Sequence, residues 1–261
     1  MTAASAEVMA AFELERLMHK AASSRFERTP SGFVCANPEL PMVWDASRVQ
    51  IEPDGEPPSL DQVLELAEQP EAWYPELRHR EVYIAQSELG RELAWSLAKA
   101  GWKLSEQAML VCREAPRQVP QNATRIEGPT MRSLKGRLGV EQGLPPNSIA
   151  QFDRYDELRA RAAARLTYAG CEGKTPLAIA DMYLRGDIAV IEDVATLRRG
   201  RRRGFASAAV VGATAAALRL SARAVYLFAD PDLARTFYEP MGFERIGGAY
   251  ECQLDPKSQG G

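Results

Sequence analysis

One strand–turn–helix unit, residues 188–220, constrains the fold more than any other part of the chain. An apolar segment, 188–196, leads into a turn with five arginines and two glycines, 198–204, and then into a helix of small residues, 204–220. At the start of such a helix the backbone N–H groups have no partner within the helix, and the helix dipole attracts negative charge. Together with the arginines, this arrangement predicts a site for a phosphate-containing ligand.

Strand and helix patterns on both sides of this unit predict a mixed α/β fold. Helices are expected at 6–22, 59–69, 88–100, 130–138, 152–164, 204–220 and 231–238. Strands are expected at 32–36, 42–51, 79–85, 107–113, 124–128, 165–171, 177–183, 188–196, 224–229 and 243–254. Antiparallel strands followed by a strand–helix–strand–helix–strand run indicate a mixed, mostly antiparallel sheet flanked by helices.

An internal repeat and a linker predict two related domains. The strand 82–85 is followed by a helix and Gly101-Trp102, and the strand 225–229 is likewise followed by a helix and Gly242-Phe243. The proline-containing segment 115–122 lies where a duplication would place its linker. We therefore expect domains at 1–117 and 118–261, although two unrelated strand–helix–strand units could match by chance.

Charge and composition set limits on ligands and location. The net charge is −3, but residues 1–118 hold 12 basic and 19 acidic side chains, whereas residues 119–261 hold 20 and 16. The basic second half suits an anionic ligand. No apolar run is long enough to span a membrane and no signal-peptide pattern is present, so we expect a cytoplasmic protein without a membrane partner. The scattered cysteines fit reduced thiols and predict no metal site: Cys35, Cys112, Cys171 and Cys252.

Two motifs in order carry a resemblance to a known family. The run 201–206, Arg-Arg-Arg-Gly-Phe-Ala, satisfies the pattern Arg/Gln-x-x-Gly-x-Gly/Ala, and it follows the strand segment 191–197. About 30 residues later, 234–243 matches Ala-x-x-φ-Tyr-x-x-x-Gly-Phe, where φ is apolar. With these motifs, residues 120–255 resemble the GNAT superfamily of N-acetyltransferases.

The chain departs from the family pattern at three places. Arg202 stands where many members have a glycine, and Asp230 stands where many have an asparagine. The first half is similar to a degenerate copy of the same fold, because it lacks the arginine–glycine turn. In that half, Leu97 occupies the position that Tyr238 has in the second. The resemblance therefore implies a single working site in a tandem chain.

The resemblance implies acetyl-CoA as the co-substrate. Backbone N–H groups of the turn would bind the pyrophosphate, and the pantetheine arm would pair with the strand before it, at Val194 and Thr196. A backbone N–H of that strand would stabilise the oxyanion. The expected cofactor-binding residues are Val194, Thr196, Arg201, Arg202, Arg203, Gly204, Phe205, Ala206, Ser207 and Asp230.

Three residues are candidates for proton transfer. Tyr238 would reprotonate the CoA thiolate, because a phenol is a donor at neutral pH; the alternative is a packing tyrosine on an amphipathic helix. Glu192 and Asp193 are consecutive acids in an apolar strand, so at most one is expected to face an acceptor amine. Glu192 is the preferred general base, and a salt bridge to an arginine is the alternative.

These observations favour an N-acetyltransferase that transfers an acetyl group directly to a small-molecule or peptide amine. A non-catalytic CoA-binding sensor is the alternative from another class. Nucleic-acid binding through the arginine turn is not favoured, because the turn lacks interleaved aromatic residues. The sequence identifies neither the amine nor the acyl length, and it does not distinguish a monomer from a homodimer.

Overall fold

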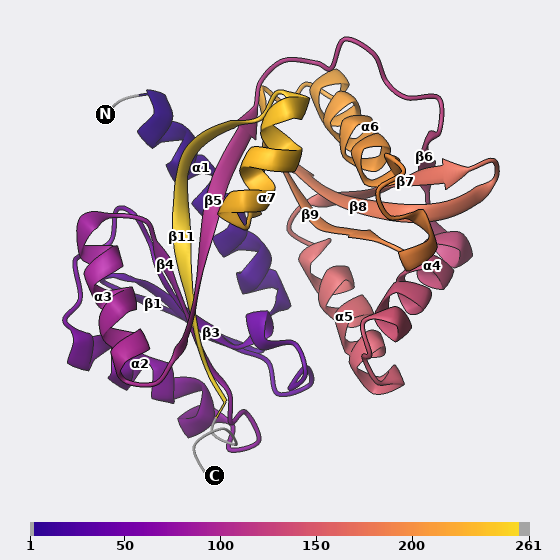
Figure 1. Cartoon of the computed structure of the whole chain (residues 1–261). Coiled ribbons are helices and arrows are strands. Elements are labelled where there is room, and N and C mark those ends of the chain that lie inside the picture. The colour runs from indigo at the N-terminus through magenta and orange to yellow at the C-terminus, as the bar shows by residue number, and fades with distance from the viewer. Residues whose placement is uncertain (1–2, 256–261) are drawn as a thin grey trace. The chain divides into compact units, whose positions relative to one another are not determined.

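The computed structural model describes residues 3–255, which form two compact units (Figure 1). The first unit comprises residues 3–109 together with 246–255, and the second comprises 110–245. The expected boundary at 117/118 differs from this division in one important respect. The C-terminal strand pairs within the first unit, although the expected boundary places it in the second domain. Local sequence patterns do not reveal this pairing, because strand partners are set by long-range contacts.

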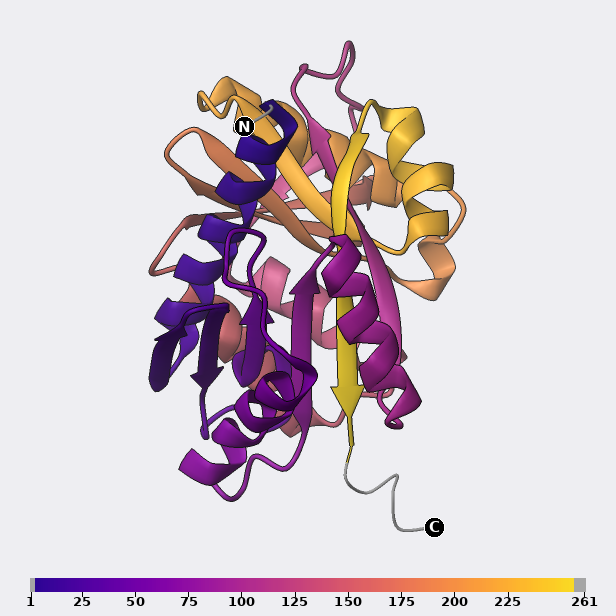
Figure 2. The same ribbon diagram turned by 90° about the vertical axis from the view of Figure 1, so that its left-hand side faces the viewer.

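The first unit is a mixed sheet with the strand order β1-β2-β3-β4-β11-β5. β3 runs parallel to β4, and β11 runs antiparallel to β4 from Ala249 opposite Ala85 to Leu254 opposite Arg80 (Figure 2). The strands are β1 (Arg25–Thr29), β2 (Gly32–Ala36), β3 (Arg48–Ile51), β4 (Arg80–Ala85), β5 (Lys103–Cys112) and β11 (Glu244–Leu254). The helices are α1 (Ala3–Ala22), α2 (Leu60–Trp73) and α3 (Glu88–Lys99).

The core of the first unit depends on the returning C-terminal strand. Tyr250, Cys252 and Leu254 of β11 are buried with apolar residues of β3, β4, α2 and α3. The helix α2 begins where the sequence predicts, because Ser59 forms a capping box with Gln62, in which each side chain accepts from the other's backbone N–H. This unit is therefore built from two segments that are far apart in the sequence.

The second unit is a sheet with the order β10-β9-β8-β7-β6, in which the parallel pair β9/β10 follows three antiparallel pairs. α6 packs on one face of this sheet and α4 and α5 on the other (Figure 1). The strands are β6 (Ala123–Ile126), β7 (Ala164–Glu172), β8 (Thr175–Arg185), β9 (Ile188–Thr196) and β10 (Ala224–Ala229). The helices are α4 (Gly128–Glu141), α5 (Pro146–Arg159), α6 (Phe205–Arg219) and α7 (Pro231–Leu233).

The small residues of α6 allow the helix to approach the sheet closely. A Cβ on Gly212 would lie 3.0 Å from the Cβ of Ala123, and a Cβ on Gly170 of β7 would collide with the carbonyl oxygen of Phe205. Most of the alanines of α6 are buried for the same reason. Close packing of this kind fixes the start of α6, where the phosphate-binding turn was predicted, against β7.

Most expected elements are confirmed, and the differences are local. The sequence analysis missed β1, whose residues are mostly polar, and it took 42–47 as strand, although Trp44–Ala46 is a turn of 3₁₀-helix. α5 begins at Pro146, earlier than expected. The two strand–helix–glycine segments share a backbone conformation at the glycine, because Gly101 and Gly242 have φ of 92° and 95°.

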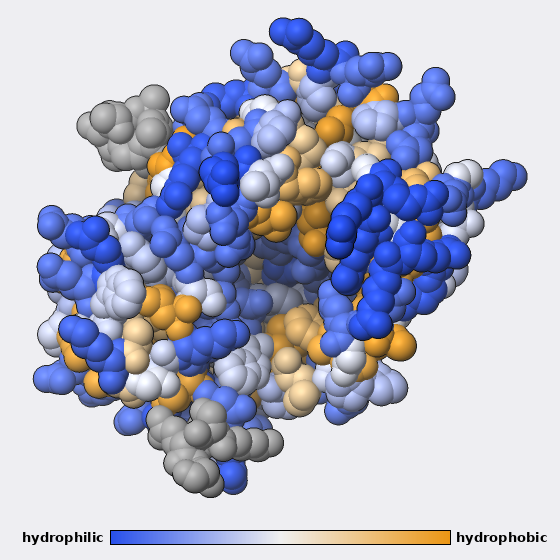
Figure 3. Space-filling view, in the orientation of Figure 1, coloured by the Kyte–Doolittle hydropathy of each residue, from blue (hydrophilic) through white to orange (hydrophobic). Residues whose placement is uncertain are grey.

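The face in Figure 3 is covered mainly by hydrophilic side chains, with apolar ones scattered among them. Of the helices in the part of the chain that the structure describes, none has the length and apolar character needed to cross a membrane.

Candidate active site

The parallel pair β9/β10 separates before β9 ends. β9 pairs with β10 only from Ile188 to Val190, whereas it pairs with β8 as far as Thr196. From Ile191 onward, no residue of β9 in the described part of the chain pairs with β10. This stretch contains Val194 and Thr196, where the resemblance predicts pairing with an extended ligand.

A β-bulge lies in the middle of this open stretch. Ile179 of β8 is opposite Ala195, but Asp181 is opposite Glu192, so Asp193 and Val194 face a single residue of β8. Asp193 has φ of 53°, in the left-handed region. The bulge removes the alternation of side chains that our sequence argument assumed. Glu192 and Asp193 both approach the guanidinium of Arg159, and that at most one of them faces an acceptor amine stays a prediction.

The turn after β9 has the geometry of an anion site. Gly204 has φ of 78° and begins α6 without a side-chain cap. From Arg202 to Ser207, the backbone N–H groups have no acceptor within residues 3–255. Arg202, where many family members have glycine, has φ of 58°. The backbone thus keeps a left-handed conformation that favours glycine, although the side chain is an arginine.

The arginine side chains around the turn differ in their contacts. The Nε of Arg201 donates to the carbonyl oxygen of Thr196 at 3.3 Å. Arg203 pairs with Glu172 and lies 5.1 Å from the ring centre of Phe205, which is buried in the core as expected. These contacts hold two arginines beside the turn and leave their positive charge near its exposed N–H groups.

One groove runs from the turn to the bulge. A cavity of about 360 Å³ lies against Thr196 and Arg201, and a second of about 220 Å³ lies around Asp193. The two cavities share lining residues of α4 and β9: Leu138, Gln142, Val194 and Ala195. The open edge of β9 therefore forms one wall of a continuous channel.

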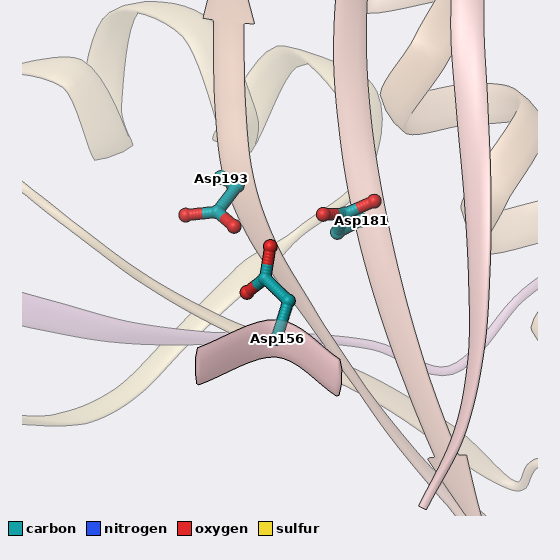
Figure 4. A group of neighbouring side chains, drawn as sticks. All are labelled: Asp156, Asp181 and Asp193. Carbon is teal, nitrogen blue, oxygen red and sulfur yellow. The ribbon is translucent and has the colours of Figure 1, made fainter. Parts of the chain in front are cut away.

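A buried charge cluster closes the inner end of the groove. Asp156 of α5, Asp181 of β8 and Asp193 of β9 point toward one another (Figure 4). The ammonium of Lys135 on α4 contacts Asp156, and it lies 2.6 Å from Asp181 and 3.2 Å from Asp193. The spacing of the three carboxylates would suit a metal ion, but the Lys135 ammonium already lies among them.

Two arginines complete the cluster. Arg159 contacts Glu192 and lies 2.8 Å from Asp156, and Arg165 lies 2.6 Å from Asp181. Burial alone would raise the pKa of Asp156, but the surrounding cations lower that pKa to about 2, and Lys135 has the largest effect among them. Burial would likewise lower the pKa of Lys135, and the three carboxylates instead raise it above its ordinary value. Asp156 and Lys135 are therefore both ionised at neutral pH.

The two acids of β9 have different surroundings. The side chain of Glu192 is 19% exposed and is taken up by Arg159, whereas that of Asp193 is 46% exposed and lines the cavity. Partial removal from water raises the pKa of Asp193, and the Lys135 ammonium opposes this rise. The sequence analysis preferred Glu192 as the base; the geometry favours Asp193, and it supports the salt-bridge alternative for Glu192.

The sequence analysis missed the three residues that organise this cluster, Lys135, Asp156 and Asp181. Asp181 carried a signal, because it is a lone carboxylate within the apolar run 177–183, and burying an unpaired charge is costly. Lys135 and Asp156 lie on helices with many other charged residues, so no pattern distinguishes them. Their association follows from the packing of α4 and α5 on the sheet.

Tyr238 lies in a π-helical turn, Ala234–Tyr238, of the kind often found at functional sites. It is 4% exposed, packs against Phe237 and Phe243, and makes no hydrogen bond through its hydroxyl to the described residues. Burial raises its pKa to about 12, so the phenol is a proton donor rather than an anion. The packing alternative and the catalytic one both fit these contacts.

Asp230 acts as a helix cap. Its Oδ1 accepts from the backbone N–H groups of Asp232 at 2.9 Å and Leu233 at 3.1 Å. This geometry accounts for an acid at the start of α7 without a cofactor. A CoA contact of its side chain, which the resemblance implies, is not needed to explain it.

The equivalent place in the first unit is acidic. Between β3 and α2 the chain has Glu52, Asp54, Glu56 and prolines instead of arginines and a glycine-led helix start. A cavity of about 540 Å³ there is lined by Glu52 and Glu88, among others. Glu52 is paired with Arg16 and Arg28, and the arginine–glycine turn of the second unit has no counterpart here.

Comparison with known proteins agrees with this geometry. Residues 137–243 match the acetyltransferase (GNAT) family model. A GCN5-related N-acetyltransferase structure from Kribbella flavida is similar over 98% of this chain and 96% of its own, with a TM-score of 0.66 and 19% identity. A functionally unknown conserved protein from Staphylococcus epidermidis is similar over 88% and 93%, with a TM-score of 0.67 and 13% identity.

A third structure resembles the two-part organisation of the chain. A tandem GNAT protein from the clavulanic acid biosynthesis pathway is similar over 78% of this chain and 72% of its own, with a TM-score of 0.51 and 13% identity. At these identities the likeness concerns the fold. No curated protein matches the sequence.

Proposed function

Since residues 137–243 carry a GNAT-family acetyltransferase domain, we propose that this protein transfers an acetyl group from acetyl-CoA to a primary amine. The observation that supports this most is the groove along the open edge of β9. It runs from Thr196 and Arg201, next to the 202–207 turn, to Asp193. A ligand with a phosphate at one end and a reactive group at the other fits this order.

In the proposed complex, the pyrophosphate binds at the start of α6. Each charge-assisted hydrogen bond from the backbone N–H groups would stabilise it by about 1.5–3 kcal/mol. Arg201 and the other arginines of the turn add long-range attraction. The pantetheine arm then extends along Thr196 and Val194, where β10 has left the edge of β9 free.

The reaction is a direct acyl transfer. The amine nitrogen forms a bond to the thioester carbonyl carbon, and the carbon–sulfur bond then breaks. Asp193 accepts the proton that the amine loses, directly or through water, and Tyr238 donates a proton to the departing thiolate. A backbone N–H at the bulge would stabilise the oxyanion. The products are an N-acetylated amine and free CoA.

Lys135 is a positioning residue in this scheme. Its ammonium contacts Asp193, Asp156 and Asp181, and thereby holds Asp193 at the groove. Without this cation, the acids would repel one another, and Asp193 would bind a proton more tightly. The cluster therefore controls both the position and the basicity of the proposed base.

A non-catalytic CoA-binding protein is the second candidate, and one observation favours it. Tyr238 is surrounded by aromatic packing contacts, which suffice to explain its presence. Titration calorimetry with acetyl-CoA and thiol release in the presence of mixed amines separate the two functions. We expect micromolar binding with turnover; binding without turnover supports the sensor, and absence of binding overturns both.

The variant Tyr238→Phe tests the proposed acid. We expect thiol release to fall by at least tenfold, while the Kd of acetyl-CoA stays within twofold, because the ring packing is preserved. Phe237→Leu is the matched control for disturbed packing in the same turn. Equal rates in the parent and Tyr238→Phe would remove Tyr238 from the mechanism and leave only its packing role.

A further inference from the structure

The cavity around Asp193 combines one wall of carboxylates with walls of apolar side chains. Leu144, Ile149, Phe152 and Ile179 form apolar walls, and Asp153, Asp156 and Asp193 line the same space. We propose that this cavity binds a small primary amine that has a single ammonium group and an apolar body. This inference rests on the proposed function and specifies its acceptor.

Asp193 brings the charge of the cluster to the cavity. The carboxylates of Asp156, Asp181, Glu192 and Asp193 contact the cations of Lys135, Arg159 and Arg165. The side chain of Asp193 is 46% exposed, whereas those of Asp156 and Asp181 are 4% and 0% exposed. An ammonium that enters the cavity therefore meets the Asp193 carboxylate.

Asp153 strengthens this preference. It lies one turn before Asp156 on α5, it lines the cavity, and it has no hydrogen bond or ion pair to another described residue. Burial raises its pKa above the ordinary value, which an arriving ammonium would reverse. The walls around an ammonium in this cavity would include the carboxylates of Asp153 and Asp193.

The remaining walls select the rest of the molecule. Phe152 is 38% exposed, and with Leu144 and Ile149 it offers apolar surface to a hydrocarbon chain or an aromatic ring. A second ammonium or a set of hydroxyls would lose its hydration against these walls without gaining partners. The cavity therefore disfavours diamines and amino sugars.

The cavity around Asp193 suits a small acceptor. Its volume is about 220 Å³, and it adjoins the cavity of about 360 Å³ along β9. Hexylamine and benzylamine have one ammonium and an apolar body, whereas an aminoglycoside has several amines and many hydroxyls.

The test compares amines on the full-length protein with saturating acetyl-CoA, and the acetylated product is identified by mass spectrometry. We expect kcat/KM for hexylamine and benzylamine to exceed those for putrescine, glucosamine and a lysine-containing peptide by at least tenfold. A higher kcat/KM for any of the last three would overturn the inference. That result would leave the proposed acetyltransferase function intact, whereas absence of acetyl-CoA binding would overturn the function itself.

Two variants test the two kinds of wall separately. Phe152→Ser should raise the KM for benzylamine about tenfold and leave the KM for methylamine and the Kd of acetyl-CoA unchanged. Asp153→Asn should raise the KM for both amines. Leu220→Ser is the matched control, because Leu220 is also an exposed apolar residue and lies at the end of α6, outside the lining of the cavity. Equal effects of Phe152→Ser on both amines would refute the apolar wall.

Amine binding can also be measured without catalysis. Saturation-transfer NMR with benzylamine on the parent should give a signal that Phe152→Ser weakens and Leu220→Ser does not. A signal that persists unchanged in Phe152→Ser places the amine elsewhere and overturns the inference, whatever the rates of acetyl transfer are.

Discussion

Replacing Lys135 with methionine tests whether a buried ammonium keeps the three aspartates of the site together. The side chain is 13% exposed, and its Nζ contacts all three carboxylates. Removing one partner from a buried charge cluster typically costs about 3–5 kcal/mol, because the remaining charges are uncompensated. We expect the free energy of unfolding to fall by about 3 kcal/mol at pH 7. This is the lower end of the typical range, because the cations of Arg159 and Arg165 remain.

The pH dependence of this loss has a definite sign. In the parent, the pKa of Asp156 is lowered to about 2, so its ionised form stabilises the fold by about 2 kcal/mol above pH 4, and this contribution disappears as the pH falls toward 2. In Lys135→Met the carboxylates repel one another, which raises their pKa. A raised pKa in the folded state makes stability fall as the pH rises. The difference in free energy of unfolding between the parent and Lys135→Met should therefore be smaller at pH 5 than at pH 7.

The assay is urea unfolding followed by far-ultraviolet circular dichroism at pH 5, 6 and 7. Intrinsic fluorescence is unsuitable, because all four tryptophans lie within residues 1–109 and report on the first unit. Lys174→Met, an exposed lysine of the same unit, is the control and should change stability little. A loss below about 1 kcal/mol, the size of a surface ion pair, or a deficit that grows toward pH 5, would refute the reasoning.

Three further changes test other parts of the structure. Asp193→Asn should reduce kcat/KM by about 10²–10⁴-fold in steady-state kinetics, as expected for a lost general base. Glu192→Gln should mainly lower thermal stability, measured in thermal melts. The reverse pattern would restore Glu192 as the base. Arg202→Gly should raise the free energy of unfolding by about 0.5 kcal/mol. Glycine relieves the left-handed backbone strain of about 1–2 kcal/mol, and this gain exceeds the cost of about 0.4–1 kcal/mol from the larger conformational entropy of glycine in the unfolded chain. Arg201→Gly, at a φ of −63°, should give no such gain in the same denaturation experiment. Deleting residues 246–261 should unfold the first unit, since β11 supplies part of its core; hydrogen exchange that stays slow in β4 and α3 of the truncated chain would contradict this.

Local patterns revealed the cofactor side of the site. The turn after β9, Gly204 at the start of α6 and the unpaired N–H groups are consequences of neighbouring residues, so the sequence predicts them in the right place. The strand 224–229 was expected with its observed bounds for the same reason. Even the departure at Arg202 could be noticed in the sequence, although its positive φ required the structure.

The acceptor side of the site could not be found in this way. Lys135, Asp156, Asp181 and Asp193 come from four different elements, and only the packing of α4 and α5 on the sheet brings them within contact. The bulge at Asp193 also depends on pairing with β8, and it reversed our preference between the two acids of β9. No local pattern encodes a register shift between two strands.

The sequence by itself determined most of the elements, the arginine-rich turn before the helix of the second half, and the absence of an equivalent turn in the first. These depend on short-range preferences, which are the backbone geometry of a glycine turn, the free N–H groups of a helix start and the charge of nearby side chains. Tertiary structure alone decided which acid faces the groove, which cation neutralises the cluster and which unit receives the C-terminal strand. Those outcomes depend on contacts between segments far apart in the chain, because burial makes a charge or a strand edge stable only when its partner is in place.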